Sequence, residues 1–285
     1  MMPRGAVIAT FASLALAACT PGEFAWRDLP PDLDRYLASF RAAAGTTFVA
    51  SLPRDELLRR LRAERVLWLG DHHTSGDLHA LQNELLAALQ RSGRALAFAL
   101  EAIGTRDEDD VDRFLRGEWS LPELRAALRR RWRGSWLDDP ELDPWHYRSL
   151  LTFAQKHAVP VVALEPTPRL PIEHRDDVIA AAVRRAAARW PERLLVVHVG
   201  QAHLRGDGDL VARTGLGGFV LGAVPPPALA RAAPARVQRG ELWQSDGDLW
   251  WFAELLGAPA GDLPPQPTPA SLRATWPSTS SAATR

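Results

Sequence analysis

Two copies of the pattern Gly-x-x-His follow runs of apolar residues, and this pairing restricts the fold of the chain more than any other feature. The first copy is Gly70–His73 after the run Val66–Leu69, and the second is Gly200–His203 after the run Leu194–Val197. Both runs are short and wholly apolar, as are strands buried on both faces of a parallel sheet. Open α/β sheets bind ligands at the carboxyl ends of their strands. The pattern therefore predicts two histidines in one crevice.

The rest of the chain alternates between strand patterns and helix patterns. Strands separated by helices form βαβ units, so we expect an α/β fold with a mostly parallel central sheet and flanking helices. Residues 107–157 contain three helical patterns and no strand pattern, which predicts a helical insert between the second and third strands. The later predicted strands span residues 95–100, 159–164, 193–199, 218–224 and 249–252.

Composition divides the 285 residues into four parts. Residues 1–18 have the pattern of a lipoprotein signal peptide, and residues 19–45 that of a tether with a short helix. Residues 46–257 are long enough for one α/β domain. Residues 258–285 are dominated by proline, serine, threonine and alanine, so we expect a disordered tail.

The N-terminal segment contains an apolar stretch, Ala6–Ala18, that is too short to span a bilayer and is typical of a secretion signal. It leads into Leu16–Cys19, which resembles the bacterial lipobox, where the cysteine receives a diacylglycerol and becomes the new N-terminus. Cys19 is the only cysteine. An ordinary signal peptide with a chance cysteine is the alternative. We expect a lipid-anchored protein of the bacterial cell envelope, and Thr20 resembles the sorting pattern for the outer membrane.

The overall charge of the chain is balanced. Lysine plus arginine and aspartate plus glutamate each total 34, so the formal net charge is zero. A balanced chain has no overall field that attracts nucleic acid or coats an anionic membrane. We therefore expect no nucleic-acid partner, and contact with the membrane only through the lipid anchor.

Ionisable residues lie at the predicted carboxyl ends of several strands. Imidazole and carboxylate groups together suit a divalent metal ion. They also suit acid–base chemistry, in which the carboxylate fixes the tautomer of the imidazole that moves the proton. The sequence leaves both alternatives open. The predicted metal ligands are His72, His73, Glu101 and His203, and the predicted catalytic carboxylates of an enzyme are Asp71 and Glu101.

The segment 129–147 mixes cationic side chains with aromatic rings. One interpretation is a solvated basic helix end with tryptophans that cover the core. The other is a haem site, since haem requires an apolar slot, an axial His or Tyr, and cations for its propionates. Arg131 and Arg133 are the cations predicted for that role.

The order and spacing of these motifs resemble those of the ChaN family of haem-binding lipoproteins, within a wider group that includes Tiki proteins, TraB proteins and erythromycin esterases. The resemblance extends over about residues 48–224. Asp71 stands where the family pattern has glutamate, which shortens the reach of the carboxylate by one methylene. The motifs that carry the resemblance are Gly70–His73 with His79, Ala99–Glu101, Trp145–Tyr147, Val159–Leu164, Arg175–Asp176 and Gly200–His203.

This resemblance implies that the chain binds haem or iron at the cell surface and acts in their uptake. The axial candidates are His79, His146 and Tyr147. Two copies pairing around the ligand would be compatible with this function. Tiki-type relatives imply a different function, metal-dependent hydrolysis by a protease or esterase that uses His73 and His203 with the two carboxylates. A scaffold with a relict site is the third alternative.

Overall fold

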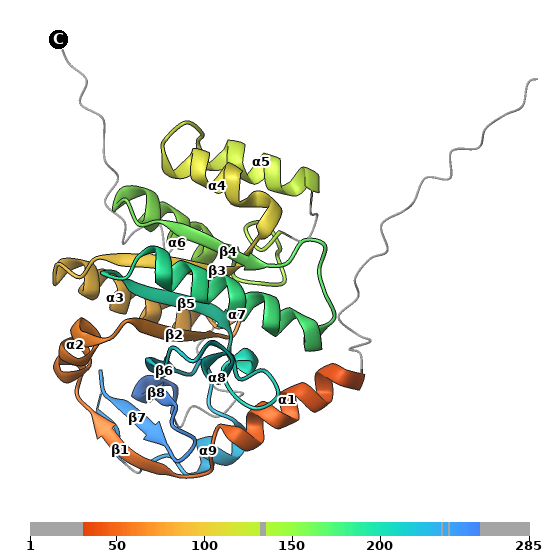
Figure 1. Ribbon diagram of the computed structural model, residues 1–285. Coiled ribbons are helices and arrows are strands. Elements are labelled where there is room, and N and C mark those ends of the chain that lie inside the picture. Colours follow the sequence, from red (N-terminus) through yellow and green to blue (C-terminus); the bar gives the residue numbers. More distant parts are fainter. Residues whose placement is uncertain (1–30, 132–134, 235, 239, 257–285) are drawn as a thin grey trace, which may run out of the picture.

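The computed structural model describes residues 31–131, 135–234, 236–238 and 240–256 (Figure 1). The predicted signal peptide, Cys19, Arg133 and the predicted tail lie outside these residues. Within the described ranges, no helix is long and apolar enough to cross a membrane.

One eight-stranded sheet forms the centre of the fold, in the order β1-β7-β8-β6-β2-β5-β3-β4. The strands from β6 to β4 in this order pair in parallel, whereas β7 pairs antiparallel with both β1 and β8. The predicted α/β class with a mostly parallel sheet is confirmed. The strands are β1 (Phe48–Leu52), β2 (Val66–Asp71), β3 (Leu96–Gly104), β4 (Val161–Glu165), β5 (Leu194–Gly200), β6 (Phe219–Leu221), β7 (Leu242–Ser245) and β8 (Trp250–Phe252).

Helices cover both faces of this sheet (Figure 1). Side chains of α2 to α6 form one core cluster with the sheet, and side chains of α1 and α7 to α9 form the other. The predicted helical insert is α4 to α6, between β3 and β4. The helices are α1 (Pro31–Ala43), α2 (Arg54–Ala63), α3 (Gly76–Arg91), α4 (Glu108–Leu115), α5 (Leu121–Arg131), α6 (Pro144–Lys156), α7 (Ile172–Arg189), α8 (Leu210–Thr214) and α9 (Pro227–Arg231).

Strand β2 shows why its sequence is apolar throughout. Its six residues are all buried. Successive side chains of a strand point to opposite faces, so Leu67 and Leu69 pack in one core cluster and Val66 and Trp68 in the other. A strand that contributes to both cores has no solvated face, and only its carboxyl end is free to carry polar groups.

Several features differ from the sequence prediction. Strand β7 was not predicted, because it is only four residues long and its two central residues are half-buried. Strand β1, an edge strand, was not predicted, because its short pattern alternates between exposed and buried residues and Val49 is 61% exposed. Strand β3 continues to Gly104, so Glu101 lies inside the strand and does not follow it. The pairing of β3 with β4 is irregular between Leu100 and Gly104, and this irregularity accompanies the extra length.

The first motif glycine is required by strand packing. A Cβ atom on Gly70 would lie 3.1 Å from both the Ala223 nitrogen and the Leu221 oxygen, which are backbone atoms that cannot move aside. We expect Gly70→Ala to lower the free energy of unfolding by about 1–3 kcal/mol, measured by urea denaturation. Gly200→Ala is the matched control, because its Cβ would meet neighbours at an ordinary 3.5 Å. Equal losses in the two variants would contradict this explanation.

Candidate functional site

The candidate site lies at the carboxyl ends of three adjacent strands, with β5 between β2 and β3. A Cβ atom on Gly200, at the end of β5, would lie 3.5 Å from Glu101 Oε2, His203 Cδ2 and His73 Cε1. The side chains of His73, Glu101 and His203 therefore surround one point. The sheet topology brings these side chains together, because neighbouring parallel strands end at the same edge of the sheet.

Asp71 is the centre of the first half of the site. Its buried carboxylate accepts a hydrogen bond from the Tyr147 hydroxyl at 2.7 Å, and lies 2.8 Å from both His73 Nδ1 and His79 Nε2. Burial alone would raise the pKa of Asp71. The imidazoles of His198, His73 and His79 instead hold that pKa well below its usual range. Asp71 is therefore ionised at neutral pH.

His73 is the partly exposed group of this half, with a side chain that is 29% exposed. Its recorded hydrogen bonds with described residues all involve Nδ1, which faces Asp71 at 2.8 Å. In the neutral imidazole Nδ1–H donates to the carboxylate, and Nε2 carries the lone pair. Burial lowers the pKa of His73, but the hydrogen bond and charge of Asp71 outweigh burial and raise it. The geometry is that of a general base.

The start of α6 fastens this half to the helical insert. Asp143 caps α6, and its carboxylate lies 2.8 Å from His79 Nδ1. The Asp143 backbone amide donates to the His73 carbonyl oxygen at 2.9 Å. The ring of Trp136 lies 4.4 Å from that of His73, between ring centroids. The insert thus fixes the backbone and the ring of the candidate base.

His203 is the centre of the second half. Its Nδ1 lies 2.5 Å from Asp176 Oδ1 and 2.8 Å from the Tyr36 hydroxyl. Its Nε2 lies 3.0 Å from Arg175 Nη2 and 3.4 Å from Glu101 Oε1. Burial lowers the pKa of His203, but Glu101 and Asp176 raise it to about 9. The imidazole is therefore a buried cation at neutral pH, between two carboxylates.

Glu101 joins the two halves. Its Oε2 accepts a hydrogen bond of 2.7 Å from the Gly200 amide, and its Oε1 lies 3.3 Å from Arg175 Nη2. Burial would raise the pKa of Glu101, but His203 and Arg175 hold it well below its usual range. Arg175 also pairs with Glu165 at 3.5 Å. The buried charges therefore compensate one another across the site.

The donors predicted to bind a metal ion do not fit one. Both ring nitrogens of His203 face protein partners, and so do both oxygens of Glu101. His72 is exposed, and its Nδ1 lies 3.4 Å from the Thr74 hydroxyl. Among the described residues, no group of three or more His, Cys, Asp or Glu side chains is arranged to hold a metal ion. Of the predicted set, only His72 and His73 have a ring nitrogen, Nε2, for which no partner among the described residues is recorded.

The predicted haem ligands do not fit an axial role in this chain. His79, His146 and Tyr147 are buried. Both nitrogens of His79 are hydrogen-bonded, the Tyr147 hydroxyl donates to Asp71, and His146 Nε2 lies 3.1 Å from His198 Nε2. Arg131, predicted for a propionate, pairs with Asp107 at 2.8 Å and with Asp110.

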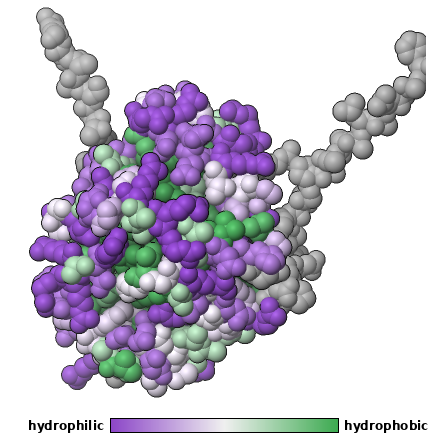
Figure 2. Space-filling view, viewed as in Figure 1, coloured by the Kyte–Doolittle hydropathy of each residue, from purple (hydrophilic) through white to green (hydrophobic). Residues whose placement is uncertain are grey.

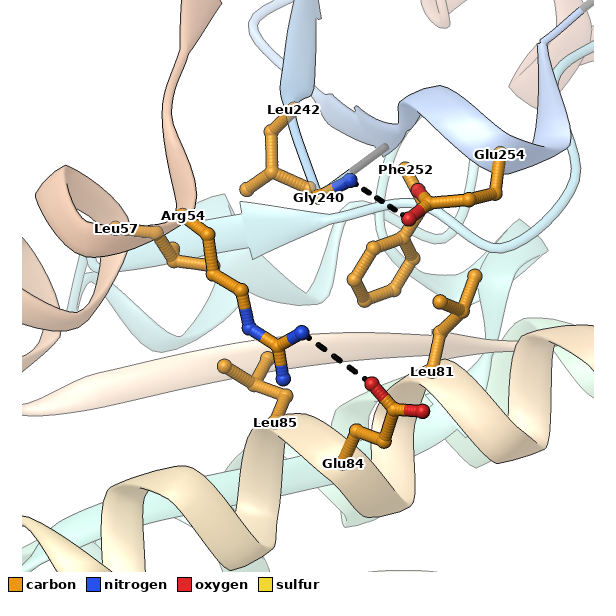
Figure 3. Close-up of a pocket in the computed structure, with 9 residues that line it drawn as sticks. All are labelled: Arg54, Leu57, Leu81, Glu84, Leu85, Gly240, Leu242, Phe252 and Glu254. Atoms are coloured by element: carbon orange, nitrogen blue, oxygen red, sulfur yellow. Dashed lines mark hydrogen bonds and ion pairs between the residues drawn. The ribbon is translucent and has the colours of Figure 1, made fainter. Parts of the chain in front are cut away.

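Two pockets of the described chain lie away from these residues. The pocket in Figure 3, between α2, α3 and the β7–β8 edge, has a volume of about 20 Å³, enough for one water molecule. A wider, open groove of about 310 Å³ adjoins Val159 and Arg193, at the amino ends of β4 and β5. That is the end of the sheet opposite to the candidate site. The face seen in Figure 2 is mostly hydrophilic, with apolar residues in small separate areas.

Sequence reasoning missed several members of the site. Tyr36 gave no sign of a site beyond its apolar character, and Trp136 was noted only as part of the aromatic segment 129–147. Arg175 and Asp176 were noted only through the family resemblance, although they begin the helix that follows β4. Glu165 lies in the structure as an ion-pair partner of Arg175.

A family model described as "Haem-binding uptake, Tiki superfamily, ChaN" matches residues 57–171. This match confirms the resemblance noted from the motifs. No curated protein is significantly similar to the chain.

Two solved structures show a weaker similarity. The type III effector HopBA1 is 19% identical, with a TM-score of 0.40 over 55% of this chain and 77% of its own. RRSP, a MARTX toxin effector domain from Vibrio vulnificus CMCP6, is 17% identical, with a TM-score of 0.43 over 80% of this chain and 43% of its own. The present chain thus spans less than half the length of that toxin domain.

We expect two buried histidines to change the pH dependence of the unfolding free energy in opposite directions. Burial lowers the pKa of His79, but Asp143 and Asp71 raise it from 6.5 to about 9. The stabilisation that His79 contributes is therefore complete below pH 6.5 and is lost as the pH rises through about 9. Burial lowers the pKa of His198 to about 4. That stabilisation is present above pH 6.5 and is lost as the pH falls through about 4.

Each shift corresponds to up to about 3 kcal/mol. We expect His79→Gln to flatten the alkaline side of the curve of unfolding free energy against pH, and His198→Gln to flatten the acid side. Some alkaline slope remains in His79→Gln, because the pKa of His203 is also raised to about 9. Urea denaturation at a series of pH values measures both slopes. If each variant changed the wrong side of the curve, the assigned charge states would be incorrect.

Proposed function

We propose that this chain, whose residues 57–171 match the model of the ChaN family in the Tiki superfamily, is a hydrolase that acts by general-base catalysis at His73. The observation that carries the proposal is the orientation of this partly exposed imidazole. Its Nδ1 is held by the ionised Asp71, which leaves Nε2 as the basic atom. His203 and Glu101 meet His73 at Gly200, and Arg175 Nη2 lies 3.0 Å from His203 Nε2.

In the proposed reaction His73 Nε2 removes a proton from water as the water oxygen attacks the carbonyl carbon of an ester or amide. Asp71 stabilises the imidazolium that forms, in the way that a buried carboxylate supports a catalytic histidine. The imidazolium then returns the proton to the leaving group when the carbon–heteroatom bond breaks. Tyr147, which donates to the same carboxylate, keeps Asp71 in the orientation that this transfer needs.

The second half of the site supplies electrostatic support. Attack by water places negative charge on the carbonyl oxygen, and the His203 imidazolium, which faces Gly200 between Glu101 and Asp176, is the cation placed to stabilise that charge. Glu101 holds the cations of His203 and Arg175 in place through its Oε1. No step passes through a metal ion, because both ring nitrogens of His203 and both oxygens of Glu101 already have protein partners.

Substitution of the base tests the hydrolase. We expect His73→Gln to lower kcat for a susceptible p-nitrophenyl ester or fluorogenic peptide by about 10²-fold or more, the usual contribution of a general base. His157→Gln is the matched control, since His157 lies at the far end of α6 against Phe153. Turnover that His73→Gln leaves unchanged, or wild-type protein without turnover on the whole panel, would rule out this function.

Haem binding is the second candidate, and the description of the matched family favours it. A haem ligand on this chain would have to be exposed, and among the histidines that the sequence analysis singled out, His72 is the exposed one. Trp145 is 49% exposed, and the guanidinium of Arg148 lies 5.0 Å from its ring centroid, so this pair offers a flat cationic surface. The lipobox-like Leu16–Cys19 supports placing either function at the cell envelope through a lipid on Cys19.

Titration with haemin separates the two candidates. A haem-binding chain is expected to shift the Soret band in a saturable way, at one haem per chain or per pair of chains. His72→Ala should then remove the shift. His79→Gln should keep it, because His79 is buried with both nitrogens bonded. A titration without a saturable shift would leave the hydrolase as the sole candidate.

A further inference from the structure

Helix α1 reaches from the N-terminal side of the chain into the second half of the site. Tyr36, in the middle of α1, is 4% exposed, and its hydroxyl donates to Asp176 Oδ2 at 2.7 Å. The hydroxyl oxygen of Tyr36 also lies 2.8 Å from His203 Nδ1. These contacts join residues 140 and 167 positions apart. The segment that the sequence presents as the end of a tether therefore contributes a buried polar atom next to a site histidine.

The loop that follows β5 is shaped to receive this helix. Figure 1 shows α1 beside this loop and α8. A Cβ atom on Gly206 would collide with the Ser39 hydroxyl, and one on Gly208 would collide with the Tyr36 hydroxyl. Gly206 also has a φ of +71°, which other residues rarely adopt. The two glycines thus permit a close approach that side chains would prevent.

A second polar contact fixes the helix in the same place. The Asp207 amide donates to the Ser39 hydroxyl at 2.6 Å, and that hydroxyl lies 3.0 Å from Asp207 Oδ1. This contact is exposed, whereas the one made by Tyr36 is buried. One face of α1 therefore carries two anchors to the loop, and the buried anchor alone touches His203.

We infer that Tyr36 is a positioning residue of the site, which fixes the ring orientation of the His203 imidazolium through Asp176. The inference rests on the proposed function, because it concerns the same site. The hydroxyl hydrogen of Tyr36 goes to Asp176 Oδ2, and Asp176 Oδ1 accepts the Nδ1 hydrogen of His203. The Tyr36 oxygen is a second acceptor for that hydrogen. The three groups close a ring of hydrogen bonds.

This ring sets the direction in which His203 faces the site. With Nδ1–H held by Asp176 and Tyr36, Nε2 points to Arg175 and Glu101. Without the Tyr36 hydroxyl, Asp176 Oδ2 loses the one donor recorded for it among the described residues. Burial of a carboxylate oxygen without a hydrogen-bond donor costs free energy. We therefore expect the Asp176 side chain to rotate and to break its hydrogen bond with His203 Nδ1.

Nitrogen NMR of histidine side chains tests the inference without any assay of turnover. In the full chain labelled with ¹⁵N-histidine, the signals of His203 are assigned by their loss in His203→Gln. In the wild type we expect a protonated Nδ1 whose hydrogen exchanges slowly with water. In Tyr36→Phe, which keeps the ring, we expect both ring nitrogens of His203 to shift and the exchange to accelerate by about tenfold, the factor expected for one lost hydrogen bond.

Ser39→Ala is the matched control, because it removes the other anchor of α1 and leaves the ring of hydrogen bonds intact. Its His203 signals should equal those of the wild type. A folded Tyr36→Phe with unchanged His203 signals would overturn the inference. So would a wild-type His203 with an unprotonated Nδ1, a result that needs no variant to fold.

A kinetic measurement connects the inference to the proposed reaction. On a substrate of the hydrolase, Tyr36→Phe should lower kcat by about tenfold and leave KM unchanged, since no bond to substrate is removed. Lack of turnover in the wild type would remove the hydrolase while the NMR result stands. Unchanged NMR signals alongside normal wild-type turnover would remove the role of Tyr36 and keep the hydrolase.

Discussion

The ionised carboxylate of Asp71 is the interaction on which the first half of the site depends. It is buried at the end of a strand that has no solvated face, and it collects two imidazoles and a phenol from three different elements. A charge in that position is tolerable only while these partners surround it. The same demand fixes His73 and Tyr147 relative to the sheet, and it makes the end of β2 a rigid support for chemistry.

The second half of the site also buries charged groups, and it contains more of them. Two carboxylates, Glu101 and Asp176, enclose the cations of His203 and Arg175, and Glu165 adds a third carboxylate beside the guanidinium. Burying any one of these charges alone would cost free energy, but opposite charges at short range offset that cost. The two halves meet at Gly200, where the side chains of His73, Glu101 and His203 all come within 3.5 Å of the position that a Cβ atom would take.

Much of this arrangement follows from local sequence, and part of it does not. Apolar runs located β2 and β5, and the parallel pairing of their neighbours brings His73, Glu101 and His203 to one edge. The prediction depended on periodicity and on which end of a strand is open. Tyr36 was beyond its reach, because nothing in a helical apolar pattern distinguishes a core residue from one whose hydroxyl meets a histidine. The same holds for the bonded state of His79, since local sequence does not reveal which partners occupy a ring nitrogen.

The docking of α1 has a mechanical consequence. If the placement of this helix and the orientation of His203 are coupled, the coupling acts equally in both directions. Force transmitted along the chain toward Pro31 would then loosen the imidazole, and any ligand that holds the imidazole firmly would raise the force needed to detach the helix. Pulling on the N-terminal side of the molecule and binding a ligand at the site therefore shift the docking equilibrium of α1 in opposite directions.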